Sequence, residues 1–409
     1  MIDIKHLREN PTAYQDSADL RGVSVNIGKL LELDRERVEL IGQVEKLRSE
    51  LNVSGKPTPE QLTKLQETKA ALEKLQSQLA QTDEAYLDLL LRVPNLIAEG
   101  TPEGGEEANR EEKTWGEAKK PDFEVADHLT LSERNDWLDF ERGAKVAGSK
   151  FLFLKGAAVK LERAVMHLAM DITEQASFTL ISVPHLVTER MVAGTGYLPR
   201  GEEHQIYKIE GEDLNLIATS EIPITGYHAD EIINPANLPL CYAGISPSYR
   251  VEGGAYGKYS KGYYRVHQFN KLEMYVFCRP QDSEAWHGKL LDLEEQICQK
   301  LEIPYRLVRI AAGDLGAPAY KKFDVEYWSP VEEKYRELMS CSNCTDYQAR
   351  RLNVRTRSSE GKTEFVHTLN GTAIGFSRIF IALLENHQTA DGKVKLPKAL
   401  QPYYGGSEL

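Results

Sequence analysis

The sequence predicts a chain of mixed helix and strand, with a helical arm in its N-terminal third and a long β-hairpin in the domain that follows. Apolar side chains that recur every seven residues predict the arm, and period-two alternation on both sides of a glycine-rich loop predicts the hairpin. Neither G-x-G-x-x-G nor G-x-x-x-x-G-K-[ST] follows a strand, so we expect neither a Rossmann domain nor a P-loop.

The arm is expected at about residues 29–92, within an N-terminal domain of residues 1–100. Each of its two helices carries an apolar seam, and the members are Leu31, Val38, Ile41, Val44, Leu47 and Leu51 in the first and Leu62, Leu65, Leu72, Leu75, Leu79, Tyr86 and Leu89 in the second. Between them, NVSGKPTPE contains Gly55, Pro57 and Pro59, which end a helix. Two helices joined by so short a breaker run antiparallel. By periodicity alone, such a hairpin is usually an interaction or dimerisation element.

Residues 101–114 are rich in Gly, Pro and Glu and show little periodicity, so we expect a linker there. The second domain then covers residues 115–409. Its first long helix is expected in LERAVMHLAMDITEQ.

The hairpin surrounds Ser248–Glu273, which reads SYRVEGGAYGKYSKGYYRVHQFNKLE. Arg265, His267, Phe269, Lys271 and Glu273 share one parity, so a cation, an aromatic ring and a carboxylate line one face of a strand. An Arg pairs bidentately with phosphate oxygens and an aromatic face stacks on a base, which is how ATP is bound without a P-loop. The alternative is an amphipathic hairpin with a solvated polar face.

Composition describes an ordinary soluble protein, with 41% hydrophobic and 27% charged residues in a chain of 409. No apolar run approaches a membrane span, and the odd number of cysteines, five, argues against a disulfide framework; we therefore expect a cytoplasmic protein without membrane attachment. Only Cys341 and Cys344 have CxxC spacing, so we expect reduced thiols and no zinc. Because the net charge is −12, any RNA binding must depend on local basic segments. Residues 348–362 form one such segment, and they are predicted equally well to contact RNA or to form a solvated loop.

Five blocks in register resemble the seryl-tRNA synthetases, a family of class II aminoacyl-tRNA synthetases. These blocks are TSE at Thr219–Glu221, YRVEGG, RVHQFNKLE, YRELMSCSN, and TLNGTAIGFSR, and the similarity begins at MIDIKHLRENP. The resemblance implies an α+β fold of the bacterial type, in which an antiparallel sheet flanked by helices follows the coiled-coil arm. It also implies a serine–tRNA ligase that makes seryl-adenylate from ATP and L-serine and transfers the seryl group to tRNA(Ser), with tRNA(Sec) left open.

The same resemblance assigns roles to side chains, with Arg250, Glu337 and Arg378 as the catalytic set. ATP is expected at Arg250, Glu252, Arg265, Phe269, Glu337, Ser340 and Arg378, with Mg²⁺ held by Glu337 and Ser340. Serine is expected at Thr219, Glu221, Arg250, Glu273, Asn370 and Thr372. The arm is expected to bind tRNA(Ser) through Lys46, Arg48, Lys64 and Lys69. The partners implied are ATP, L-serine, tRNA(Ser) and a second copy of the chain, and no DNA.

Lys258 and Lys261 stand in the hairpin loop where the family usually has Arg, and an ammonium lacks the planar fork of a guanidinium. Two other functions fit the same residues. One is a paralogue that makes seryl-adenylate for an acceptor other than tRNA, and the arm argues against it. The other is a binding protein without catalysis, which the intact Arg250, Glu252, Glu337 and Arg378 oppose.

Overall fold

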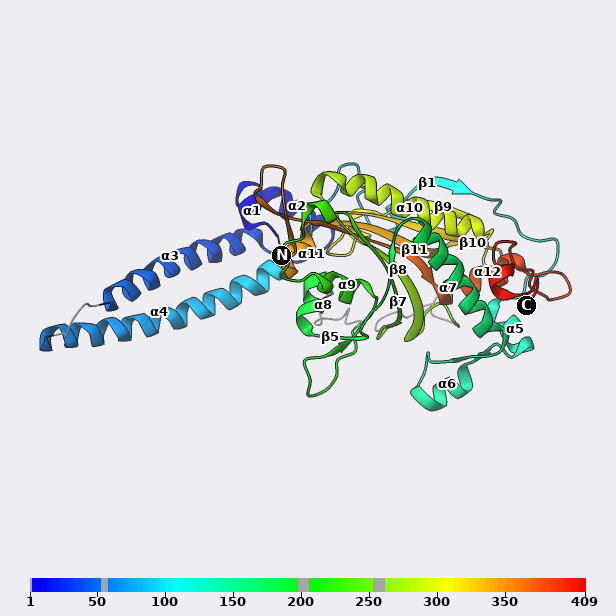
Figure 1. Cartoon of the computed structure of the whole chain (residues 1–409), viewed down its shortest axis with the longest axis horizontal. Coiled ribbons are helices and arrows are strands. Elements are labelled where there is room, and N and C mark those ends of the chain that lie inside the picture. Colours follow the sequence, from blue (N-terminus) through cyan, green and yellow to red (C-terminus); the bar gives the residue numbers. More distant parts are fainter. Residues whose placement is uncertain (1, 53–57, 198–205, 253–261) are drawn as a thin grey trace. The chain divides into compact units, whose positions relative to one another are not determined.

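The computed structural model describes residues 2–52, 58–197, 206–252 and 262–409. The chain divides into two compact units, residues 1–96 and 97–409 (Figure 1). Within the described residues, no helix is both long and apolar enough to cross a membrane.

The first unit is helical, as the sequence predicts. Two short helices, α1 (Ile4–Glu9) and α2 (Pro11–Leu20), precede the arm helices α3 (Ile27–Leu51) and α4 (Pro59–Arg92). The Asn26 side chain accepts a hydrogen bond from the backbone N–H of Lys29 and begins α3. Thr58 and Gln61 form a reciprocal capping box at the start of α4, where Pro59 occupies the first turn.

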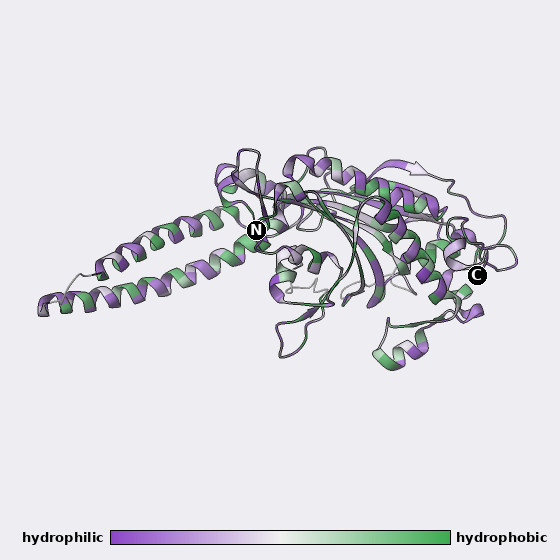
Figure 2. Ribbon diagram, viewed as in Figure 1, coloured by the Kyte–Doolittle hydropathy of each residue, from purple (hydrophilic) through white to green (hydrophobic). Residues whose placement is uncertain are grey.

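The arm helices pack along a narrow seam, and Figure 2 shows hydrophilic and hydrophobic residues along both. Val44, Leu72 and Tyr86 of the predicted seam are buried, together with Leu30, Leu40 and Leu90. Val38 and Leu62 were predicted in the seam, but they are 52% and 49% exposed. The reason is geometric: two helices cover only one stripe of each other, and residues outside that stripe meet water. Arg37 and Asp83 form an ion pair across the helices at 2.5 Å.

An eight-stranded sheet forms the centre of the second unit, in the order β1-β9-β10-β11-β14-β8-β7-β4. Its strands are β1 (Arg110–Trp115), β4 (Thr179–Ser182), β7 (Leu240–Tyr249), β8 (Gln268–Cys278), β9 (Tyr305–Arg309), β10 (Lys321–Ser329), β11 (Lys334–Thr345) and β14 (His367–Gly375). Neighbouring strands are antiparallel except for β4 and β7, which are parallel. The chain therefore has the expected α+β fold.

The segment 101–114, expected as a linker, is not one throughout. Arg110–Trp115 is the edge strand β1, which pairs antiparallel with β9. Every residue of β1 is exposed, so the strand lacks the alternation by which a half-buried strand is recognised in a sequence.

Three helices supply most of the apolar core on one face of the sheet: α7 (Ala157–Gln175), α10 (Ser283–Lys300) and α12 (Phe376–His387). Smaller elements complete the unit. The helices are α5 (His128–Asn135), α6 (Phe140–Ala147), α8 (Glu189–Thr195), α9 (Glu221–Tyr227), α11 (Tyr347–Leu352) and α13 (Gln401–Tyr404), and the strands are β2 (Leu138–Asp139), β3 (Phe153–Leu154), β5 (Leu186–Val187), β6 (Asn215–Leu216), β12 (Arg355–Arg357) and β13 (Thr363–Phe365).

The predicted hairpin is the pair β7 and β8, joined in continuous antiparallel register from Leu240↔Phe277 to Tyr249↔Gln268. Lys258 and Lys261 lie outside the described residues, so the expectation about their charge stays a prediction.

Candidate functional site

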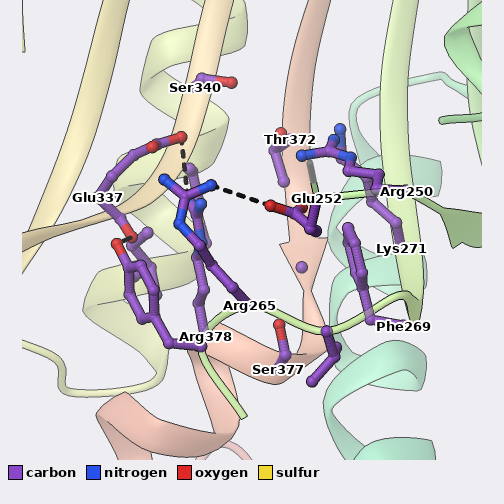
Figure 3. Close-up of a pocket in the computed structure, with 15 residues that line it drawn as sticks. Arg250, Glu252, Arg265, Phe269, Lys271, Glu337, Ser340, Thr372, Ser377 and Arg378 are labelled. Carbon is purple, nitrogen blue, oxygen red and sulfur yellow. Dashed lines mark hydrogen bonds and ion pairs between the residues drawn. The ribbon is translucent and has the colours of Figure 1, made fainter. Parts of the chain in front are cut away.

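The residues predicted to hold ATP converge on one cleft near the Tyr249–Gln268 end of the hairpin, where β7 connects to β8. The cleft is lined by Arg250, Glu252, Arg265, Phe269, Lys271, Glu337, Ser340, Thr372, Ser377 and Arg378, among others. Figure 3 shows Phe269 on one side of the cleft and Glu337 with Arg378 on the other. Strands β8, β11 and β14, the start of α12 and the connection between β7 and β8 supply these side chains, so residues more than a hundred positions apart share one site.

Two ion pairs occupy this cleft. Glu337 Oε1 lies 2.8 Å from a guanidinium nitrogen of Arg378, and Glu252 Oε2 lies 3.1 Å from one of Arg265 (Figure 3). Burial opposes ionisation of Glu337, but the charges of Arg378 and Lys322 outweigh it and lower the pKa of Glu337 to about 2. Glu337 is therefore a carboxylate at neutral pH.

Aromatic rings fix two of the guanidinium groups. The guanidinium carbon of Arg250 lies 5.3 Å from the centre of the Phe269 ring, and that of Arg378 lies 4.8 Å from the centre of the Tyr264 ring. The Tyr264 hydroxyl donates a hydrogen bond of 3.1 Å to the Glu337 carbonyl, and burial raises the pKa of Tyr264 to about 12. Tyr264 thus holds both members of the Glu337–Arg378 pair in place.

A second, larger cavity of about 690 Å³ adjoins the cleft. Its wall includes Glu221, Glu273, Asn370 and Cys344, and it shares Arg250, Lys271, Glu337 and Ser340 with the cleft. A molecule in either space therefore meets the same four side chains.

Buried carboxylates line this cavity. Glu221 Oε1 accepts hydrogen bonds from Gln348 Nε2 at 2.6 Å and Asn370 Nδ2 at 3.1 Å. Burial, followed by the charge of Glu273, raises the pKa of Glu221 to about 7. The Glu273 carboxylate forms an ion pair with the Lys271 ammonium, and both side chains are almost fully buried.

Two residues predicted for the serine pocket lie elsewhere. Thr372 lines the smaller cleft. Thr219 is fully buried and lines neither space; its hydroxyl accepts a hydrogen bond of 3.3 Å from the backbone N–H of Glu221. Thr219 therefore supports the backbone that presents Glu221.

Several side chains at the site had no predicted role. Lys271 shares the parity of Phe269 on β8, yet it carried no predicted role, although it lines both spaces. Lys322 and Asp324 on β10 lie outside every motif; Lys322 lines the larger cavity and pairs with Asp324 at 3.0 Å. Burial raises the pKa of Asp324 to about 7. Only the pairing of β10 with β11 brings this pair to Ser340 and Ser342.

Other candidate residues have partners of their own. His267 lies outside both spaces, and its Nδ1 is 2.9 Å from the Arg250 carbonyl oxygen. In the basic segment 348–362, Arg350 pairs with Asp346 at 2.7 Å and Arg351 donates to the Ala193 carbonyl at 2.9 Å. On the arm, Lys46, Arg48, Lys64 and Lys69 are exposed. Cys341 belongs to the apolar core, whereas Cys344 faces the larger cavity.

Comparison with known proteins identifies the family of this chain. Residues 1–97 match the seryl-tRNA synthetase N-terminal domain, and residues 205–387 match the tRNA synthetase class II core domain (G, H, P, S and T). The serine–tRNA ligase of Dictyoglomus turgidum is 48% identical over 100% of this chain and 99% of its own length. The chain belongs to the seryl-tRNA synthetase family.

Other members of the family agree in sequence and structure. The serine–tRNA ligase of Treponema denticola is 44% identical over 99% of both chains. The seryl-tRNA synthetase from Pyrococcus horikoshii, solved in complex with ATP, superposes with a TM-score of 0.91 at 38% identity, covering 100% of this chain and 99% of that one. The cytoplasmic serine–tRNA ligase from Naegleria fowleri, solved in complex with AMP, superposes with a TM-score of 0.85 at 33% identity. The match covers 100% of this chain and 98% of that one.

Proposed function

We propose that this chain activates L-serine with ATP and transfers the seryl group to the terminal adenosine of tRNA(Ser). One observation carries the proposal: the cleft predicted for ATP and the cavity predicted for serine share the Arg250 side chain. Activation needs the serine carboxylate and the α-phosphorus of ATP at one point, and a guanidinium there pairs with both anions.

ATP is bound in the smaller cleft in this scheme. Phe269 offers its ring to adenine, Glu252 accepts from the adenine amino group, and Arg265 and Arg378 hold the outer phosphates. The cleft has a volume of about 90 Å³, whereas ligand pockets typically reach roughly 300–1,000 Å³. We infer that the Glu252–Arg265 and Glu337–Arg378 pairs separate as ATP enters, so that each guanidinium exchanges a carboxylate for phosphate oxygens.

The residues present fit a magnesium ion. Glu337 is ionised, Ser340 lies on the same strand, and both line the cleft with hard oxygen donors of the kind Mg²⁺ prefers. When bound, the ion would neutralise charge on the phosphates. The chain's own contribution is to orient the carboxylate of serine and to stabilise charge through Arg250 and Arg378.

Serine is selected in the larger cavity. Glu221 and Glu273 provide carboxylates for the ammonium group, and Asn370 can bond the substrate hydroxyl. An analogue without that hydroxyl leaves buried polar groups unpaired, which costs about 1–3 kcal/mol. Alanine should therefore support much weaker exchange than serine.

The arm, by this proposal, contacts the RNA duplex of tRNA(Ser) through phosphates and shape. We further propose a homodimer, a cytoplasmic location and binding of no DNA. Charging of tRNA(Sec) follows if its long arm offers the same shape.

The test is ATP–pyrophosphate exchange with each amino acid in turn, with aminoacylation of total tRNA measured in parallel. Serine should give the strongest exchange, and the charged tRNA should be tRNA(Ser). Exchange with alanine equal to that with serine contradicts the pocket assignment, and exchange without tRNA charging favours a different acceptor. Sedimentation of an active monomer contradicts the dimer.

A further inference from the structure

Gln348 is a fully buried side chain that contacts the Glu221 carboxylate but lines neither the cleft nor the larger cavity. It lies on α11, whereas Glu221 is the first residue of α9. Gln348 Nε2 donates a hydrogen bond of 2.6 Å to Glu221 Oε1. It donates a second, of 3.1 Å, to the carbonyl oxygen of Thr195, the last residue of α8. One amide therefore joins α8, α9 and α11.

The surroundings of Gln348 permit only one orientation of its amide. A backbone carbonyl can only accept a hydrogen bond, so the amide nitrogen must face Thr195 and Glu221. On the opposite side, Gln348 Oε1 accepts hydrogen bonds from the Tyr275 hydroxyl at 2.8 Å and from the Thr368 hydroxyl at 2.7 Å. Both donors and both acceptor positions of the amide are thus used, and a buried network in which every group is paired holds its members rigidly.

The network restrains one oxygen of Glu221 and leaves the other for a ligand. Oε1 accepts the bond from Gln348 and a further one of 3.1 Å from Asn370 Nδ2. Among the described residues no group donates to Oε2, and the carboxylate lines the cavity proposed for serine. Amide donors favour the ionised form of a carboxylate. A carboxylate that is already fixed also binds an ammonium group without the cost of ordering it first.

We propose that Gln348 is a positioning residue that holds the Glu221 carboxylate in the orientation that binds the ammonium group of serine. The inference rests on the proposed function, since it takes the larger cavity as the serine site. Gln348 touches no substrate and acts through Glu221. A glutamate of the same shape could not replace it, because a carboxylate has no proton to donate to Glu221 or to the Thr195 carbonyl.

Gln348→Met tests the role, because it keeps the length of the side chain and removes its hydrogen bonds. It should raise the serine KM in pyrophosphate exchange about tenfold and leave the KM for ATP within about twofold of wild type. Gln299→Met is the matched control. Gln299 Nε2 donates to the Tyr305 hydroxyl at 3.0 Å, and Gln299 lines neither space. The serine KM of that variant should equal the wild-type value.

A double substitution shows whether Gln348 acts through Glu221. If it does, adding Gln348→Met to Glu221→Gln should change the serine KM by less than about twofold beyond the effect of Glu221→Gln alone. A general structural defect would instead multiply the two effects. The inference is overturned by multiplied effects, by an unchanged serine KM in Gln348→Met, or by equal rises in the KM for serine and for ATP.

Thermal unfolding is measured for every variant. No exchange in wild-type protein overturns the proposed function, whereas exchange in wild type with an unchanged serine KM in Gln348→Met overturns only this inference. Should Gln348→Met not fold, Gln348→Asn replaces it, because its amide is one methylene too short to reach Glu221, and the same outcomes apply. If neither variant folds, Gln348 serves the stability of the fold and the inference is overturned.

Discussion

Arg378→Ala should nearly abolish adenylate formation while the chain stays folded. The Arg378 side chain is 17% exposed, pairs with Glu337 at 2.8 Å and lies over the Tyr264 ring at 4.8 Å. Its proposed partners during the reaction are ATP phosphates. Loss of one donor to a transition-state charge lowers a rate by roughly 10²–10³, and we expect a loss of that order in serine-dependent exchange.

The effect on stability should be much smaller. The pKa of Glu337 is about 2 against an ordinary 4.5, a shift worth at most about 3 kcal/mol. The Glu337 side chain is 37% exposed and Lys322 also stabilises its charge, so we expect a loss of only about 1 kcal/mol at neutral pH. A lowered pKa stabilises the fold above pH 4.5, so the difference from wild type should shrink as the pH falls toward 2.

The assay combines pyrophosphate exchange with thermal unfolding, and Arg306→Ala is the control. Arg306 pairs with Glu326 at 2.6 Å and lies over the Tyr335 ring at 4.7 Å, but it is on β9 outside the cleft. That variant should lose similar stability and exchange normally. Normal pyrophosphate exchange in the Arg378 variant, or an equal loss of exchange in the Arg306 variant, refutes the proposed contact between Arg378 and the ATP phosphates.

Three further outcomes follow from the site and the arm. The pKa of Glu221 is about 7, and its ionised form is proposed to bind the serine ammonium, so the serine KM should fall as the pH rises from 6 to 8. Glu221→Gln should flatten this pH dependence, and a variant whose KM changes with pH as in wild type excludes the role. Removing residues 29–92 should spare pyrophosphate exchange and strongly weaken charging of tRNA(Ser), and full-rate charging would assign the arm to another partner. Reversing the charges of Lys46, Arg48, Lys64 and Lys69 should lower the salt slope of tRNA binding by about one unit for every phosphate that the arm no longer neutralises, whereas an unchanged slope means that other residues bind the phosphates.

Local patterns predicted the elements that repeat or alternate. The heptads located both arm helices, and parity on β8 placed Phe269 and Lys271 at one cleft. Arg265 reaches the same cleft from the connection before β8, so the predicted strand face begins too early in the sequence. Parity fails where a strand does not alternate, which is why the wholly exposed β1 was predicted as part of a linker. The heptad pattern fails for Val38, because it does not say how wide a stripe of each helix will be covered.

Side chains that reach the site from distant elements carry no local signal. Gln348 bonds Glu221 from α11, and Lys322 reaches the cavity from β10. Neither belongs to a block that the family resemblance marked. Both positions depend on strand pairing and burial, which a single sequence does not display.

The central claim is that serine and ATP meet at Arg250, and formation of seryl-adenylate in a single turnover tests it most directly. Enzyme in excess of labelled serine is mixed with ATP and magnesium without tRNA, and the adenylate is quantified after quenching. Wild-type protein should form seryl-adenylate, and Arg250→Ala should form it at least about a hundredfold more slowly. Adenylate formation by the Arg250 variant at the wild-type rate would contradict the claim.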